Sequence, residues 1–240
     1  MSRRGPDLLR VLTWNIHGCV GRAGRFEPDV VAATVAALEP DIVALQEVDA
    51  RRALAGGFDT FEMLTGALGA SAFAARTIVT DEGDYGHMLL SRWPLEGCRR
   101  LDLSVPGREP RAAILATVRV PGLDVTVAAA HLGLRARERA AQLDALTAAL
   151  EGGDPDGGAA IVLGDFNEWR RRGVASRRLC PPFQPAAALP SFPARRPILA
   201  LDRIWCRPPL TPHAARTVTE ARDASDHLAV LAELRTASAG

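Results

Sequence analysis

Residues 112–132 read AAILATVRVPGLDVTVAAAHL, and this stretch decides the fold class. The two apolar runs within it, 112–120 and 123–132, have the length and composition of β-strands. Because Pro121-Gly122 between them favours a turn, we expect the runs to form an antiparallel hairpin. A chain that simply alternated strands and helices around a parallel sheet would not contain this hairpin. The sequence therefore predicts a mixed β architecture.

The segments on either side of the hairpin contain further strands and helices. Strand-like apolar runs lie at 8–16, 41–48, 72–79, 86–91, 161–165, 199–206 and 228–234. Helical spacing is found at 27–38, 58–69 and 136–150. The segment 170–197, rich in arginine and proline, predicts either a short helix with irregular connections or a mobile loop. No linker-like shift in composition separates these runs, so we expect one α/β domain with two sheets over 8–235, between tails at 1–7 and 236–240.

The composition of the 240-residue chain is that of an ordinary globular protein. Apolar residues make up 48% and charged residues 24% of the sequence. The 29 basic residues, all arginine, nearly balance the 28 acidic ones, which gives a formal net charge of +1. Binding to nucleic acid mainly through phosphate neutralisation needs a large basic excess, so this balance argues against it.

Cysteine spacing and hydropathy give little sign of a zinc site or a membrane segment. The four cysteines form no C-x-x-C pair, so neither structural zinc nor a dense disulfide framework is indicated. The first residues lack the apolar core of a signal peptide, and no run reaches 18 uninterrupted apolar residues. We therefore expect a cytoplasmic protein without a transmembrane segment.

Polar residues recur where predicted strands end. They are Asn15, His17, Gln46, Glu47, His131, Asp165, Asn167, Asp202, Asp226 and His227. Half-buried carboxylates and amides are unfavourable unless they bind a cation or pair with one another. Collected at one rim, these groups would form an oxygen-rich site that suits Mg²⁺ or Mn²⁺ better than zinc. A metal, a base and fixed donors are what phosphoester hydrolysis requires, and here a His-Asp pair would supply the base.

Six fragments, five of which together contain all of these residues except His131, occur in a fixed order along the chain. They are TWNIH (13–17), LQEV (45–48), LLSRWPL (89–95), GDFNE (164–168), LDRIW (201–205) and SDHLAV (225–230). Together they resemble the endonuclease/exonuclease/phosphatase superfamily of metal-dependent phosphohydrolases, over about residues 8–235. The resemblance implies a DNase I-like fold, which is a four-layer α/β/β/α sandwich of two face-to-face mixed β-sheets with outer helices.

The resemblance also implies which residues bind metal and water. Glu47 would be the principal ligand of Mg²⁺ or Mn²⁺, with Asn15 and Asp226 in or near the coordination shell. Asp165 and Asn167 would orient the attacking water and a phosphate oxygen. Taken singly, each has an ordinary interpretation, since asparagine favours turns and aspartate caps helices. It is their joint occurrence in family order that supports the catalytic interpretation.

The histidines complete the implied site. His227, held by Asp202, would contact the scissile phosphate or act as general base, and His131 would support the transition state or the leaving group. Substrate contacts are expected from His17, His87 and Arg111. His17 and His131 stand where the DNA-repair branch of the family usually carries aspartate and tyrosine, so both point away from abasic-site repair.

Competing functions fit the sequence less well. A dinucleotide-binding oxidoreductase is disfavoured because Gly18, Gly21 and Gly24 do not match the G-x-G-x-x-G spacing. A non-catalytic binding module on the same fold would be expected to lack some rim residues. With 12 aromatic residues and no excess of charge, the chain favours a small phosphodiester, a phosphomonoester or a phospholipid headgroup over nucleic acid. A DNase I-like nuclease remains the alternative, peripheral membrane contact stays open, and a monomer is expected.

Overall fold

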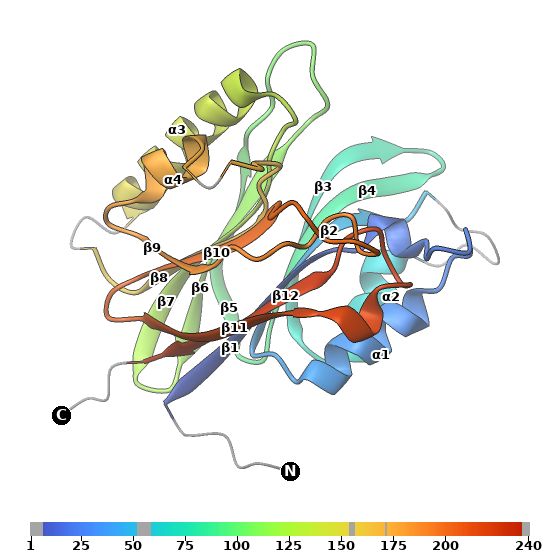
Figure 1. Ribbon diagram of the computed structural model, residues 1–240, viewed down its shortest axis with the longest axis horizontal. Coiled ribbons are helices and arrows are strands. Elements are labelled where there is room, and N and C mark those ends of the chain that lie inside the picture. Colours follow the sequence, from blue (N-terminus) through green and yellow to red (C-terminus); the bar gives the residue numbers. More distant parts are fainter. Residues whose placement is uncertain (1–6, 52–58, 154–156, 171, 237–240) are drawn as a thin grey trace.

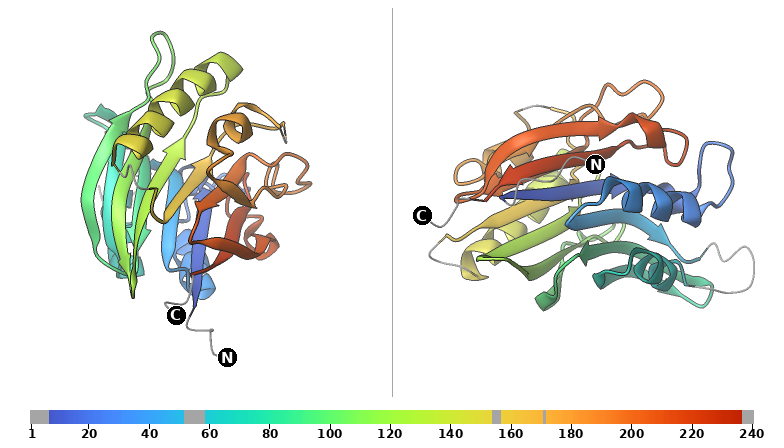
Figure 2. Two further views of the ribbon diagram at one scale, coloured as in Figure 1. Left: turned by 90° about the vertical axis from the view of Figure 1, so that its left-hand side faces the viewer. Right: turned by 90° about the horizontal axis from the view of Figure 1, so that it is seen from below.

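The computed structural model describes residues 7–51, 59–153, 157–170 and 172–236, and these form a four-layer sandwich (Figure 1; Figure 2). Its two six-stranded mixed sheets have the orders β11-β12-β1-β2-β4-β3 and β5-β6-β7-β8-β10-β9. The first sheet consists of β1 (Leu8–Asn15), β2 (Ile42–Asp49), β3 (Ser71–Thr80), β4 (Gly83–Ser91), β11 (Thr211–Val218) and β12 (Ala229–Arg235). The second consists of β5 (Leu95–Asp102), β6 (Ala112–Val120), β7 (Leu123–His131), β8 (Ala160–Asp165), β9 (Gln184–Ala187) and β10 (Asp202–Arg207).

Helices cover the outer faces of both sheets. α1 (Pro28–Leu38) and α2 (Thr60–Leu68) pack on the first sheet, whereas α3 (Ala136–Gly153) and α4 (Val174–Leu179) lie on the opposite side of the sandwich (Figure 1). Two short 3₁₀ turns, η1 (His17–Cys19) and η2 (Thr219–Ala221), belong to the connections. Among the described helices, none has both the length and the apolar character needed to cross a membrane.

Alternation along the strands divides the core into layers. In β1, Leu9 and Val11 point into the apolar layer between the sheets, while Leu12 and Trp14 point toward α1 and α2. This follows from the two-residue period of a strand, and both faces are buried because the sheet is covered on both sides. A third layer joins the second sheet to α3. Helices that are apolar on one face and strands that are apolar on both faces thus account for all four layers.

Most of the predicted elements are present, with differences at the sheet edges. The expected hairpin is confirmed as β6 and β7, with Val120 opposite Leu123. The segment 170–197 contains α4 and β9, and the strand expected from residue 199 begins only at Asp202. The sequence does not predict β5, β9 or β11. Most of the expected tails, 1–7 and 236–240, lie outside the described residues.

The topology brings the predicted site residues to one rim. β1 and β2 are parallel, as are β7 and β8, so the ends of these strands point the same way. β12 runs antiparallel to β1 and β10 antiparallel to β8, so both begin at this rim. Asn15, His131 and Asp165 therefore end their strands beside Asp202, which begins β10, and His227, which lies in the segment just before Leu228 and β12.

Candidate active site

Asp165 lies at the centre of the rim. It is the last residue of β8 and sits opposite His131 of β7 and Asp202 of β10. Gly164 before it has φ +145°, and a Cβ at this position would overlap the carbonyl oxygen of Ala130 on β7. Only glycine allows so close an approach of two backbones at such a φ. The Gly-Asp pair of the sequence motif therefore fixes the position of Asp165 against β7.

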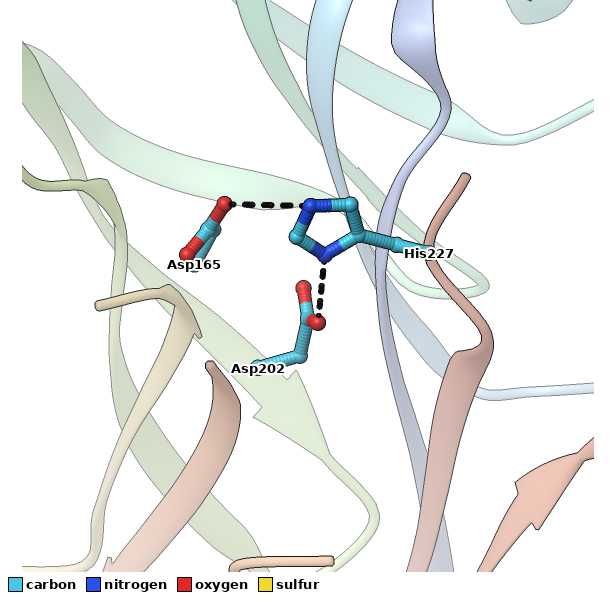
Figure 3. Close-up of side chains that lie close together, drawn as sticks. All are labelled: Asp165, Asp202 and His227. Atoms are coloured by element: carbon cyan, nitrogen blue, oxygen red, sulfur yellow. Dashed lines mark hydrogen bonds and ion pairs between the residues drawn. The ribbon is translucent and has the colours of Figure 1, made fainter. Parts of the chain in front are cut away.

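His227 lies between two aspartates, as Figure 3 shows. Its Nδ1 donates to Asp202 Oδ2 at 2.8 Å, and its Nε2 is 3.9 Å from Asp165 Oδ2. The ring of Phe192 packs against the imidazole with centroids 4.8 Å apart, and Trp14 Nε1 donates to the carbonyl oxygen of His227 at 3.0 Å. These contacts fix the orientation of the imidazole and direct Nε2 toward Asp165.

The aspartates control the protonation of this group. Burial alone disfavours a charged His227, but Asp202, Asp165 and Asp226 outweigh it and raise the pKa of His227 to about 10. Burial, together with the charge of Asp202, raises the pKa of Asp165 to about 6. At neutral pH His227 is thus a cationic donor, and Asp165 is a carboxylate whose pKa suits the acceptance of a proton.

Asn15 connects the two sheets at the site. Its Nδ2 donates to Glu47 Oε1 at 2.8 Å and to Asp165 Oδ2 at 3.1 Å, and its Oδ1 accepts from the His17 backbone N–H at 3.1 Å. Glu47 sits in a β-bulge at 45–48 and has φ +56°, which is uncommon for a residue other than glycine. Bulges redirect side chains near functional sites, and here the bulge directs Glu47 toward Asn15.

Glu47 and Asp226 form the part of the rim that can hold a metal ion. Glu47 Oε2 and Asp226 Oδ1 lie 3.8 and 3.6 Å from the same atom, His17 Nδ1. Their side chains are 27% and 45% exposed, so a hydrated cation can reach them. Carboxylate oxygens are hard donors that suit Mg²⁺ and Mn²⁺, and the imidazole nitrogen adds a donor that Mn²⁺ accepts more readily. The donor set fits a divalent cation.

A second group of potential ligands lies deeper in the site. Asp165, Asp202 and His227 offer atoms within 4.8 Å of one another, and all three side chains are buried. In this group the His227–Asp202 hydrogen bond already occupies Nδ1 and Oδ2. A cation there would have to compete with the positive charge on the imidazole. The buried group is therefore better suited to proton transfer, and the exposed carboxylates are better suited to the metal.

Arg111, which directly precedes β6, is a buried cation beside His131, and His131 Nε2 in turn lies 3.8 Å from Asp165 Oδ2. Its Nη1 is 3.0 Å from His131 Nδ1 and 3.1 Å from Glu109 Oε1. Because arginine can only donate, the His131 nitrogen must accept and the ring is neutral. Burial, and then Arg111, hold the pKa of His131 well below its usual value and lower the pKa of His87 to about 4. Among the described residues, Arg111 Nε has no hydrogen-bond partner, which leaves a donor for an anion.

Asn167 is anchored close to Asp165. Its backbone N–H donates to Asp165 Oδ1 at 2.9 Å, and its Nδ2 donates to the carbonyl oxygen of Leu132 at 2.9 Å. It has φ +48°, a left-handed conformation that asparagine tolerates better than most residues. One side-chain N–H remains available for a water or phosphate oxygen.

The structure thus brings the predicted residues together, with differences of detail. His17 lies beside Glu47 and Asp226, His87 is buried near Arg111, and the remaining predicted residues surround Asp165. Ser225 is a site residue that the sequence does not single out. Its hydroxyl donates to the Asn15 carbonyl oxygen at 2.7 Å and accepts from the His227 N–H at 3.1 Å. Its position before Asp226 and His227 in SDHLAV was the only available signal.

Comparisons with known proteins agree with this geometry. The sequence profile of the Endonuclease/Exonuclease/phosphatase family matches residues 12–227. The uncharacterized protein YbhP of Escherichia coli K12 is 33% identical over 243 residues, which cover 94% of this chain and 96% of YbhP.

Solved structures with a similar fold include the following two. The endonuclease/exonuclease/phosphatase from Beutenbergia cavernae DSM 12333 superposes with a TM-score of 0.80 at 24% identity, covering 96% of this chain and 72% of that chain. The mannosyl-6-phosphatase Bt3783 of Bacteroides thetaiotaomicron VPI-5482 gives 0.78 at 17% identity, with coverages of 94% and 99%. At these identities the structures establish the fold and leave the substrate open.

Proposed function

The chain belongs to the endonuclease/exonuclease/phosphatase family, and from this premise we propose that it hydrolyses a small or lipid-linked phosphoester by metal-assisted attack of water. Members of the family are hydrolases that depend on divalent metal ions. One observation carries the proposal for this chain: a cationic His227, held by Asp202, faces the Asp165 carboxylate across 3.9 Å. A proton acceptor and a phosphate-binding donor are thereby held side by side.

The metal ion would be Mg²⁺ or Mn²⁺, held by Glu47 and Asp226. Asn15 would keep Glu47 in place through the 2.8 Å hydrogen bond to Oε1 and would complete the ligand set with its side-chain oxygen. His17 Nδ1, close to both carboxylates, would add a nitrogen donor. When bound, a divalent cation polarises a phosphoryl oxygen and offsets the charge that develops in the transition state.

Asp165 and His227 would carry out the proton chemistry. Asp165, whose pKa is raised to about 6, would orient the attacking water and accept its proton. Asn167, fixed by its bond to the Leu132 carbonyl oxygen, would hold that water with its remaining N–H. His227 would donate from Nε2 to a non-bridging phosphate oxygen, and Asp202 would keep the imidazole charged and oriented.

Arg111 and His131 would bind the other side of the phosphate. The Arg111 side chain is buried, so its charge acts on a phosphoryl oxygen with little screening by water. His131 is neutral and lies 3.8 Å from Asp165 Oδ2 through its Nε2. It would form a hydrogen bond with the leaving oxygen without adding a positive charge.

The proposal is tested by a metal-supplemented activity screen over bis-p-nitrophenyl phosphate, plasmid DNA, sphingomyelin and inositol phosphates. We expect hydrolysis of a small or lipid-linked ester that stops on EDTA treatment and returns with Mg²⁺ or Mn²⁺. Glu47→Gln should lower kcat by at least about 10²-fold, because it removes a charged metal ligand. The exposed Glu220→Gln serves as the matched control. Activity that survives complete removal of metal, or abasic-site nicking faster than hydrolysis of small diesters, would contradict the proposal.

A further inference from the structure

Two cavities open on either side of His17, and they carry opposite charges. The larger, about 770 Å³, we call the arginine cavity because its lining includes Arg22, Arg195, Arg196 and Arg222, together with Asp226 of the proposed metal site. The smaller, about 240 Å³, we call the acidic cavity because its lining includes Glu47, Asp49 and Glu109. Both share a wall with the proposed metal ligands, so each is a candidate for the remainder of the substrate.

The acidic cavity disfavours an anion. Among the described residues that line it, the one arginine is Arg51, which is already paired with Asp49 through hydrogen bonds of 3.0 Å from both Nε and Nη2. Glu109 lies 3.1 Å from Arg111 and so offsets that cation on this side. An anionic part of the substrate placed in this cavity would be repelled by Glu47, Asp49 and Glu109, because the nearby Arg51 and Arg111 already pair with Asp49 and Glu109.

The arginine cavity contains guanidinium groups that are available to bind an anion. Within the described part of the chain, no carboxylate lies within ion-pair distance of Arg195, Arg196 or Arg222; Arg222 uses its Nε to donate to the Thr219 carbonyl oxygen at 3.1 Å. The Arg22 side chain pairs with one carboxylate among the described residues, Asp223, through an exposed contact of 3.6 Å. Guanidinium groups bind phosphate or carboxylate through paired N–H donors, so several arginines of this cavity can bind one anion together.

The segments that carry these arginines are fixed to the active site. The backbone N–H of Ala194 donates to the carbonyl oxygen of Asp226 at 2.7 Å, directly before Arg195. On the opposite wall, the Arg22 N–H donates to the Asp223 carbonyl oxygen at 2.8 Å. The cavity walls are thus joined by backbone hydrogen bonds to the segment that supplies Asp226. The backbone that carries Arg22 and Arg195 is therefore held at a set position relative to Asp226.

We propose that the arginine cavity binds a second anionic group, a phosphate or a carboxylate, carried by the same substrate molecule as the scissile phosphoester. This inference rests on the proposed hydrolase function and narrows its substrate class. The volume lies within the range of about 300–1,000 Å³ found for small-molecule sites, so the cavity also has room for the organic part between the two anions. Val20, Pro193 and Ala194 supply apolar walls for that part.

The experiment compares fructose 1,6-bisphosphate with fructose 6-phosphate, which differ by one phosphate. Hydrolysis gives kcat/KM for each, and isothermal titration calorimetry in EDTA gives Kd independently of turnover. We expect the wild type to prefer the bisphosphate by about tenfold in both measurements, which corresponds to about 1.4 kcal/mol. Because the arginines are exposed, the preference should shrink in 1 M salt, where the Debye length is only about 3 Å.

The variant Arg195→Ala/Arg196→Ala should reduce that preference to within about twofold, and Arg222→Ala should reduce it in part. Arg177→Ala/Arg178→Ala, an adjacent pair on α4 outside this cavity, removes the same charge and should retain the wild-type preference. If thermal melting shows that the Ala variant is unfolded, Arg195→Gln/Arg196→Gln replaces it.

The outcomes separate this inference from the proposed function. Phosphoester hydrolysis with no preference for the bisphosphate, or with a preference that the cavity variant leaves intact, would overturn the second anion site while the hydrolase proposal stands. Arginine-dependent binding of the bisphosphate without hydrolysis of any phosphoester would support the anion site and overturn the hydrolase proposal. Failure to bind the bisphosphate more tightly than the monophosphate would overturn the inference whether or not the protein is an enzyme.

Discussion

The substitution Asp202→Asn should make His227 far less basic while leaving its position nearly unchanged. Asn keeps the shape of the side chain and an oxygen that can accept from Nδ1, but it removes the charge 2.8 Å from the ring. Burial works against the imidazolium, and Asp202 is the strongest of the three carboxylates that overcome it. Raising the pKa of His227 from 6.5 to about 10 corresponds to about 5 kcal/mol in favour of the charged form. Most of this should be lost in the variant.

The raised pKa of His227 makes the free energy of unfolding depend on pH. Because the folded-state pKa of His227 is raised above its unfolded value, the stabilisation is fully present below about pH 6.5 and is lost as the pH rises toward 10. For one proton the slope is about 1.4 kcal/mol per pH unit, so metal-free wild type should lose about 2 kcal/mol of unfolding free energy between pH 6.5 and 8. Measurements stop at pH 8 because burial also raises the pKa of Cys19 and Cys206, which would add a second loss at higher pH.

Three measurements test the reasoning. NMR titration in EDTA should show a lower pKa for His227 in Asp202→Asn, and urea unfolding at pH 6.5 and 8 should show a smaller difference than in wild type. The kcat should fall about 10²–10⁴-fold for Asp202→Asn and for His227→Ala. Because the residues act as a unit, the double variant should be little worse than the worse single variant. An unchanged His227 pKa, or strictly additive losses of kcat, would refute the coupled pair.

Two further predictions concern the metal site and the strand that presents Asp165. His17→Ala should weaken Mn²⁺ binding, measured by calorimetry, by roughly tenfold more than Mg²⁺ binding, because a nitrogen donor favours Mn²⁺; equal losses would remove His17 from the ligand set. Gly164→Ala should destabilise the fold by about 3 kcal/mol or more, because the added Cβ meets the Ala130 carbonyl oxygen at an unfavourable φ. The Tm should fall by about 6–12 °C, and a Tm within 2 °C of wild type would show that β7 and β8 need not approach so closely.

The fold was predictable where strands are buried on both faces. The continuous apolar run in β2 and the paired runs of β6 and β7 are of this kind. β5 and β11 escape prediction because they are edge strands with half-exposed or exposed side chains, and their sequences carry charged residues or proline. An edge strand needs little hydrophobic pattern, because one neighbour and a few backbone hydrogen bonds hold it.

The site was predictable as a set of residues and unpredictable as a set of contacts. Polar residues at the ends of apolar strands stand out in the sequence because burying them is unfavourable unless they bind a ligand or one another. The contact of Asn15 with Asp165 spans 150 positions, and the acceptance of an Arg111 N–H by His131 depends on how β6 and β7 pair. The arginine cavity lies still further from prediction, because its arginines come from separate loops with no shared motif.

The two sheets meet at the rim, and each supplies residues to the proposed site of phosphoester hydrolysis. The first sheet supplies Asn15 and Glu47, which would hold the metal, and the segment before its strand β12 supplies His227, which would donate to the phosphate. The second sheet supplies His131, Asp165 and Asp202, which would bind the leaving oxygen, accept the proton and orient His227. The 3.1 Å hydrogen bond from Asn15 to Asp165 joins the two sets directly. Because the apolar layer between the sheets fixes their separation, this close-packed core would set the distance between a metal held by Glu47 and the proposed base Asp165. The proposed catalytic alignment would therefore depend on the packing of apolar side chains between the sheets, away from the rim.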